Sequence, residues 1–182
     1  DALPIYRFAD WGKQFCLDQY SDVKAGLEKI AGHEIKSEDI AAAIKVYNKS
    51  RKARREFVKL ANAHCDVIDP IMRSAVLKAS YFMRKDEYTE KLEALNTELR
   101  ALPEAKWNGV KVVTSGIIVD NPTLLKIFKD NNVAIAADDV AHESRMIRVD
   151  ADETGDPMEA LCKQFADQDY DVLLYDEASE QN

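Results

Sequence analysis

The stretch from Val112 to Arg145 constrains the fold most, because it reads as a strand, a turn, a helix and a second strand without interruption. The first strand, residues 110–114, is mostly β-branched and apolar, as expected of a strand buried in a parallel sheet. A helix is predicted over residues 122–131 and the second strand over residues 133–137. This order predicts a right-handed parallel βαβ unit.

Polar residues follow each predicted strand. Ser115 and Gly116 come after the first strand, and Asp138 and Asp139 come after the second. Ligands of open α/β sheets bind at the carboxyl ends of the strands. A site is therefore sought at residues 114–117 and 138–145.

Helical patterns dominate the chain before this unit, and the α/β pattern resumes after it. Helices are predicted over residues 16–31, 38–63, 69–82 and 85–101, then over 157–167, with a further strand at 171–175. The predicted class is α/β: a helical connector followed by part of a parallel βαβαβ sheet. Three strands make a thin sheet, so we expect an internal portion of a longer protein.

Composition excludes several classes of function. The chain carries 33 acidic and 25 basic residues, a net charge of -8, which argues against general nucleic-acid binding. Its apolar runs fall short of the ~20 residues that a membrane-spanning helix needs. Three widely spaced cysteines (Cys16, Cys65 and Cys162) argue against a disulfide framework or a local zinc site and favour a reducing cytoplasm. Cys162 lies in the apolar phase of its helix and is expected to be a buried core thiol.

Several other groups have two interpretations. The basic run from Lys45 to Lys59 could grip a phosphate, but on an amphipathic helix a solvated face is favoured. His142 could act as an acid, a base or a ligand-orienting group. Asp138 and Asp139 could hold a cation, but capping or pairing with Arg145 and Arg148 is favoured. Nucleotide-binding and serine-hydrolase motifs are absent from the sequence.

Several short sequence motifs, by their order and spacing, resemble those of the 2-hydroxyacyl-CoA dehydratase family, and within it the β-subunit. The family also includes the benzoyl-CoA reductase subunits. The resemblance runs over essentially the whole chain. The motifs are YNxxR at Tyr47 to Arg51, FMRK at Phe82 to Lys85, TSGI at Thr114 to Ile117 and ADDxAxExR at Ala137 to Arg145.

This resemblance implies a cytoplasmic, oxygen-sensitive lyase of anaerobic amino-acid fermentation. Such an enzyme removes water from an (R)-2-hydroxyacyl-CoA to give the enoyl-CoA, through a ketyl radical. The implied partners are an α-subunit and an ATP-hydrolysing iron-sulfur activator that injects one electron. The implied cofactor is a 4Fe-4S cluster on cysteines. The alternatives are a benzoyl-CoA reductase-like subunit and a purely structural module that packs on other subunits.

The resemblance also implies a flavodoxin-like sheet and a division of the chain. Residues 1–14 would end a preceding α/β domain, residues 15–106 would form the helical connector, and residues 107–182 would open a second α/β domain. The cysteines of this chain do not match the family's ligand positions, so its cluster ligands are expected elsewhere in the subunit. The expected substrate-binding residues are Thr114, Ser115 and Gly116, with Asp139 and Arg145 as an orienting pair.

Overall fold

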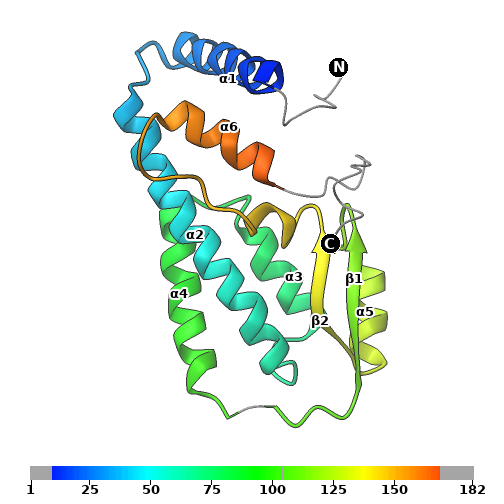
Figure 1. Cartoon of the computed structure of the whole chain (residues 1–182). Helices are drawn as coiled ribbons and strands as arrows, with labels where there is room; N and C mark the ends of the chain where they lie inside the picture. The colour runs from blue at the N-terminus through cyan, green and yellow to red at the C-terminus, as the bar shows by residue number, and fades with distance from the viewer. Residues whose placement is uncertain (1–9, 104, 169–182) are drawn as a thin grey trace. The chain divides into compact units, whose positions relative to one another are not determined.

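The computed structural model describes residues 10–103 and 105–168 (Figure 1). The described residues form α1 (Asp10–Ala31), α2 (Ser37–Ala63), α3 (Pro70–Ala79), α4 (Lys85–Ala101), β1 (Val110–Gly116), α5 (Pro122–Asp130), β2 (Val133–Val140), a short 3-10 helix (Arg145–Ile147) and α6 (Pro157–Asp167). The α/β class is confirmed, and each predicted helix is present. The first begins earlier than predicted, at Asp10 rather than residue 16.

Three helices begin with the same kind of N-terminal cap. In each, a side-chain oxygen accepts backbone N–H groups of the first turn, and a proline occupies that turn. The capping residues are Asp69 for α3, Asn121 for α5 and Asp156 for α6. The cap satisfies N–H groups that have no partner inside the helix, and proline has no N–H to leave unpaired. Because a capping residue followed by proline is visible in the sequence, the predicted starts of α5 and α6 are correct and that of α3 is within one residue.

β1 and β2 pair in parallel, with Val110 opposite Val133 and Gly116 opposite Val140. The parallel βαβ unit is therefore confirmed. Both strands are longer than predicted, and this corrects the placement of the polar residues. Ser115 and Gly116 lie inside β1, and Asp138 and Asp139 lie inside β2, because the ladder continues to the last of these residues. The predicted third strand at 171–175 lies outside the described residues.

The chain divides into two compact units. Among the described residues, the first comprises residues 10–48 and 149–168, and the second comprises residues 49–103 and 105–148. Within the first unit, Ile44 of α2 packs with Ala151 and with Ala160 of α6. Within the second, Phe57 of α2, Leu77 of α3 and residues of α4 form a larger apolar core. The sheet belongs to the second unit. Of the proposed domains, residues 1–14 fall mostly outside the described part of the chain.

The basic run on α2 is only partly the solvated face that we predicted, because its lysines are exposed but its arginines are not. Arg51 and Arg54 are buried, with 8% and 7% of their surface exposed. Arg55 donates a hydrogen bond to the backbone carbonyl of Ile147 at 2.5 Å. The prediction is wrong for these arginines because the second unit packs around this part of α2. Arginine can lie in such a position when its guanidinium finds oxygen acceptors.

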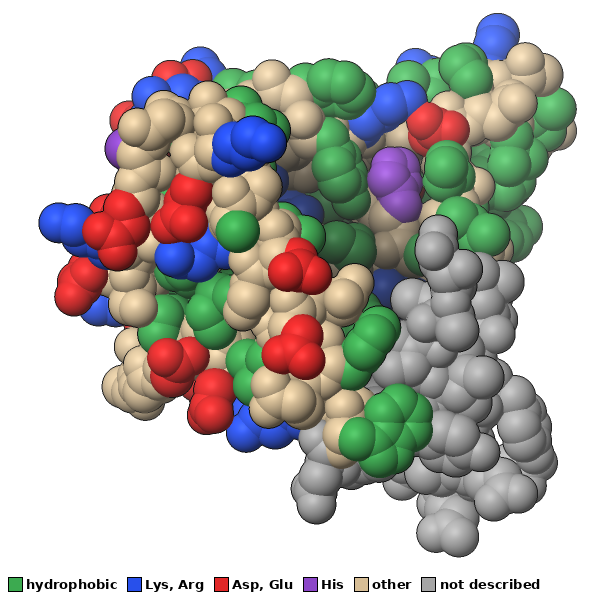
Figure 2. Space-filling view, turned by 90° about the horizontal axis from the view of Figure 1, so that it is seen from above, with side chains coloured by type: hydrophobic (Ala, Val, Ile, Leu, Met, Phe, Trp, Pro, Cys, Tyr) green, Lys and Arg blue, Asp and Glu red, His purple; other side chains and the backbone are tan. Residues whose placement is uncertain are grey.

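Charged side chains of both signs are interspersed with apolar ones on the face shown in Figure 2. None of the helices in the described residues is long and apolar enough to cross a membrane.

Candidate functional site at the carboxyl edge of the sheet

The two predicted clusters meet at one edge of the sheet. Thr114 pairs with Asp138, and Ser115 pairs with Asp139. Since side chains alternate along a strand, the first pair lies on one face and the second on the other. Thr114 and Asp138 are both 8% exposed, whereas Ser115 is exposed and Asp139 is partly exposed. The structure therefore brings the candidate residues together but divides them between a buried face and an accessible face.

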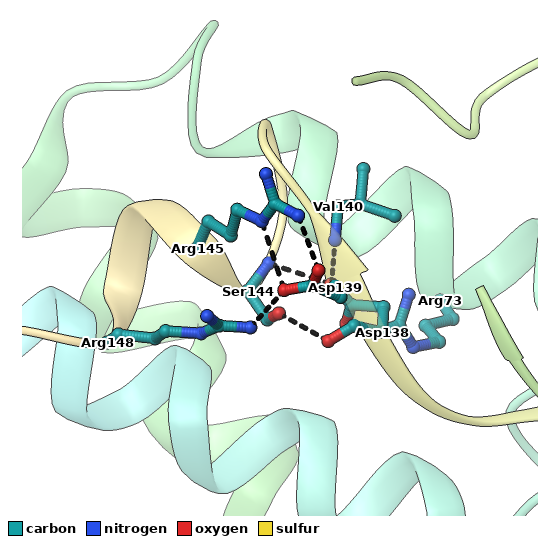
Figure 3. A network of polar contacts seen from close by, with 7 residues as sticks. All are labelled: Arg73, Asp138, Asp139, Val140, Ser144, Arg145 and Arg148. Carbon is teal, nitrogen blue, oxygen red and sulfur yellow. Dashed lines mark hydrogen bonds and ion pairs between the residues drawn. The ribbon is translucent and has the colours of Figure 1, made fainter. Parts of the chain in front are cut away.

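On the accessible face, one carboxylate is held by two guanidinium groups (Figure 3). Arg145 donates from Nε to Oδ1 of Asp139 at 3.0 Å and from Nη2 to the other carboxylate oxygen. Arg148 also donates to Oδ1. The Arg145 side chain is 11% exposed, and those of Asp139 and Arg148 are each 37% exposed. The expected pairing of Asp139 with Arg145 and Arg148 is confirmed.

The charges of this cluster define what it can do. Hydrogen bonds from Arg145 are the main cause that lowers the pKa of Asp139 to about 2, and bonds from Arg148 add to it. Asp139 is therefore ionised at neutral pH and has no proton to donate. Two cations against one anion leave the cluster with a net charge of +1. Such a cluster suits the binding or orientation of an anionic group.

On the buried face, Asp138 belongs to a second network. Its Oδ1 accepts the backbone N–H groups of Val140 at 3.2 Å and Ser144 at 3.0 Å. Its Oδ2 accepts from Arg73 of α3, which also donates to Glu143. The three charged side chains are at most 4% exposed. Both carboxylate oxygens of Asp138 are thus occupied: it caps the segment after β2, as predicted, but its ion-pair partner is Arg73 and not Arg145 or Arg148.

Burial dominates the pKa of Glu143. It raises that pKa above the usual value, although Arg73 acts in the opposite direction. The network holds two carboxyl groups against one cation, so it is short of positive charge. It fixes the segment that follows β2, including Ser144, whose hydroxyl donates to the carbonyl of Asp138 at 2.7 Å. This anchored segment carries Arg145, so the buried network positions the accessible cluster.

Arg73 is the functional residue that the sequence interpretation missed. It lies 65 residues before Asp138. One signal could have found it. Arg73 falls in the buried phase of α3, with Pro70, Ser74 and Leu77. A cation on the buried side of a helix calls for a buried acidic partner.

Gly116 and Thr114 complete the edge. Gly116 has a φ of +143°, a conformation that side chains rarely adopt, and a Cβ built there would meet no atom within 4 Å. Glycine is therefore required by the backbone and not by a close neighbour. The Oγ1 of Thr114 is buried and has no hydrogen-bond partner among the described residues. Both features are compatible with the predicted backbone and hydroxyl contacts to a ligand.

His142 lies beyond β2 and stacks on Tyr81, with ring centroids 5.1 Å apart and planes inclined by 22°. The Tyr81 hydroxyl donates to the backbone carbonyl of His142 at 2.8 Å. The imidazole also helps Lys78, the main cause, to lower the pKa of Asp120. Stacking positions the His142 ring, and the Tyr81 bond holds the His142 backbone. An acid-base role for His142 stays a prediction.

The described residues contain no group of three or more His, Cys, Asp or Glu side chains that could hold a metal. Cys65 and Cys162 are buried, as expected for Cys162, and Cys16 is partly exposed. A 4Fe-4S cluster takes a set of cysteine thiolates. These residues do not fit one, and we assign no reaction step to a cluster here.

Comparison with known proteins connects this fold to a family. Residues 2–178 match the family described as 2-hydroxyglutaryl-CoA dehydratase, D-component. The β-subunit of (R)-2-hydroxyglutaryl-CoA dehydratase from Acidaminococcus fermentans is 59% identical over 176 residues, which cover 96% of this chain and 46% of that protein. The β-subunit of (R)-phenyllactyl-CoA dehydratase from Clostridium sporogenes is 40% identical over 172 residues, 94% of this chain and 46% of that protein.

A third relative agrees with these two. The β-subunit of lactoyl-CoA dehydratase from Anaerotignum propionicum is 40% identical over 161 residues, 88% of this chain and 43% of that protein. The chain thus spans less than half the length of these curated relatives. The match covers nearly all of the chain, and the relatives are β-subunits. The chain therefore belongs to the 2-hydroxyglutaryl-CoA dehydratase D-component family, in its β-subunit branch.

Proposed function

We propose that the chain is part of the β-subunit of an (R)-2-hydroxyacyl-CoA dehydratase, which removes water from its substrate to give an enoyl-CoA. One observation carries this proposal: the 59% identity to a β-subunit named for 2-hydroxyglutaryl-CoA dehydration. The reaction is the one for which all three relatives above are named, although their acyl groups differ.

The proposal extends to the assembly. An α-subunit is the expected partner, since the relatives are named as β-subunits. We also propose an ATP-dependent iron-sulfur activator that delivers one electron, a ketyl radical on the acyl group, and a cytoplasmic location. The 4Fe-4S cluster is placed in parts of the subunit other than the described residues. The sheet is proposed to be flavodoxin-like, with the domain division at residues 14 and 106.

Within this scheme, the carboxyl edge of the sheet binds and orients. Thr114, Ser115 and Gly116 would contact the substrate through backbone and hydroxyl groups. The cluster of Asp139, Arg145 and Arg148 would attract an anionic group, such as a phosphate of the coenzyme A moiety. Arg145 is the member with the least exposed side chain and is held through two of its nitrogens. It is therefore the best-fixed donor of the cluster.

Replacing Arg145 by alanine in the full complex tests this role. We expect turnover of 2-hydroxyacyl-CoA to fall about 10- to 100-fold, as misplacement of a bound substrate does. Arg100→Ala is the matched control, because Arg100 pairs with Glu56 on the surface, far along the chain from the edge. Unchanged turnover by a folded Arg145→Ala complex would refute the site. Activity of the wild-type complex on benzoyl-CoA instead of 2-hydroxyacyl-CoA would favour the reductase-like alternative.

The structural-module alternative rests on the exposed apolar side chains of α1. Trp11 and Val23 are each 58% exposed, and Ile30 is 85% exposed. Surfaces of this kind mark interaction sites. Under this alternative, substitution of these residues would weaken subunit association while Arg145→Ala would leave turnover intact. Measuring both properties for each variant separates the two proposals.

A further inference from the structure

An aromatic pair, Tyr81 and His142, lies just beyond the edge of the sheet at which β1 and β2 both end (Figure 1). The backbone N–H of His142 donates to the carbonyl of Ile117, the residue after β1, at 3.3 Å. The two rings stack with centroids 5.1 Å apart, and the Tyr81 hydroxyl donates to the His142 carbonyl at 2.8 Å. All three residues belong to the second compact unit. Their contacts fix the aromatic pair at the carboxyl edge of the sheet.

The pair is open to solvent on the side of Tyr81. One face of the Tyr81 ring lies against His142, yet 47% of the residue is exposed, so solvent reaches the ring from its other side. Three apolar neighbours are also exposed: Phe82 by 79%, Ile117 by 55% and Ile118 by 59%. Exposed apolar side chains that lie together mark interaction sites. An open aromatic ring favours a flat ring as its ligand, because such rings stack on one another.

A cationic cluster borders the aromatic pair. The ion pair of Arg145 with Asp139 closes a loop that has His142 at its midpoint. Three residues of fully extended chain span at most about 11 Å, so the Cα atom of His142 lies no farther than that from the Cα atoms of the ion pair. Arg148 contacts the same carboxylate and leaves the cluster with a net charge of +1. A ligand stacked on the aromatic pair therefore has cationic groups beside it.

We propose that the Tyr81 ring stacks on the adenine ring of the coenzyme A moiety of the substrate, while Arg145 and Arg148 bind its phosphates. This inference rests on the proposed function and names the part of the substrate that the site recognises. A nucleotide joins a flat ring to anionic groups, whereas an apolar peptide lacks the anionic groups and an inorganic anion lacks the ring. Loss of one base-stacking contact lowers affinity about 5- to 150-fold.

A purely structural role for Tyr81 depends on other features of the side chain. The hydroxyl holds the His142 backbone, whereas a stacked base requires the ring. Tyr81→Phe removes only the hydroxyl, and Tyr81→Leu removes the ring as well. Since Tyr81→Leu also removes the stacking on His142, a second ligand is needed to show that the substrate site stays intact. Pantetheine serves this purpose, because it is the part of coenzyme A that lacks the nucleotide.

Equilibrium dialysis of coenzyme A and of pantetheine against the complete dehydratase complex tests the proposal. The wild-type complex should bind coenzyme A more tightly than pantetheine. Tyr81→Leu should weaken the binding of coenzyme A about 10-fold or more and leave that of pantetheine unchanged. Tyr81→Phe should retain most of the affinity for coenzyme A.

Trp107→Leu is the matched control. Trp107 lies in the same compact unit, just before β1, and its Nε1 is 3.4 Å from the carbonyl oxygen of Val110, the first residue of that strand. The substitution thus removes an aromatic ring from the opposite end of β1. It should change neither affinity.

Three outcomes would overturn the inference. Unchanged affinity of Tyr81→Leu for coenzyme A would show that no base stacks on this ring. Equal weakening of coenzyme A and pantetheine binding would show that the ring only supports the edge of the sheet. A loss in Tyr81→Phe as large as that in Tyr81→Leu would assign the effect to the hydroxyl. These measurements need no turnover, so a wild-type complex that fails to dehydrate 2-hydroxyacyl-CoA would overturn the proposed function separately.

Discussion

Replacing Arg73 by methionine removes the only cation that contacts both Asp138 and Glu143 in the described residues. The side chains of Arg73, Asp138 and Glu143 are 3%, 0% and 4% exposed, so solvent cannot take the place of the guanidinium. Removing one partner of a buried ion pair costs about 3–5 kcal/mol of stability, because a buried charge is left uncompensated. Two carboxyl groups are left here. We therefore expect a loss of at least about 3 kcal/mol in the free energy of unfolding of the β-sheet region.

Hydrogen exchange of the β2 amides in the intact subunit measures this loss locally. Since about 1.4 kcal/mol corresponds to a tenfold change in an equilibrium, exchange of the most protected β2 amides should accelerate at least about 100-fold. Arg100→Met provides the matched control. It deletes the same charge from a pair with Glu56 whose side chains are 53% and 40% exposed. Its effect should stay below about 1 kcal/mol, as for other exposed pairs.

The pH dependence follows from Glu143. A carboxyl group with a raised pKa favours the folded state most when it is protonated. Its contribution is fully present below the usual pKa of 4.5 and is lost as pH rises through the folded-state value. Without Arg73, which lowers this pKa, the folded-state value rises further. The defect of Arg73→Met should therefore shrink between pH 8 and pH 5, and Glu143→Gln should partly rescue it at pH 8. Equal effects of Arg73→Met and Arg100→Met, or a defect independent of pH, would refute the reasoning.

Three further predictions concern single contacts. Gly116→Ala should destabilise β1 by about 1–3 kcal/mol because of its φ of +143°, whereas Gly26→Ala in α1, without such a φ, should not; exchange of local amides distinguishes them. Asp139→Asn should lower the free energy of unfolding by about 1 kcal/mol or less, because Asp139 is partly exposed. The measurement is a small fall in the melting temperature. That difference should be constant above the usual pKa of 3.8 and vanish as pH falls through about 2. Asn48→Ala removes hydrogen bonds to both the carbonyl and the N–H of Ala151, at 2.8 and 3.1 Å, and should cost about 2 kcal/mol, seen as faster exchange at residues 149–155. Unaltered exchange at these residues would contradict the role of Asn48.

Local signals account for the parts of the fold that were predicted correctly. The helix starts at Pro122 and Pro157 depend on a capping side chain and a proline, which are adjacent in sequence. The strand ends were misjudged for the opposite reason. Polar residues such as Ser115 and Asp139 are typical of loops, but here they continue a ladder whose partner strand stabilises them.

The candidate site shows the same division. Asp139, Arg145 and Arg148 are close in sequence, so their pairing could be inferred from the spacing alone. Arg73 could not be assigned to Asp138 in this way, because only the packing of α3 against β2 brings them together. The burial of Arg51 and Arg54 was hidden for a related reason. Helical periodicity gives the face of a residue but not what covers it.

By itself, the sequence determined the α/β class, the parallel βαβ unit, the family, and the pairing of acidic residues at the end of the second strand with the arginines that follow it. These depend on residue patterns within short windows and on the order of motifs. The tertiary structure alone decided which charges are buried together and on which face of the sheet each carboxylate lies. Such contacts join residues far apart in the chain, and their energies depend on the loss of water around them, which no local pattern encodes.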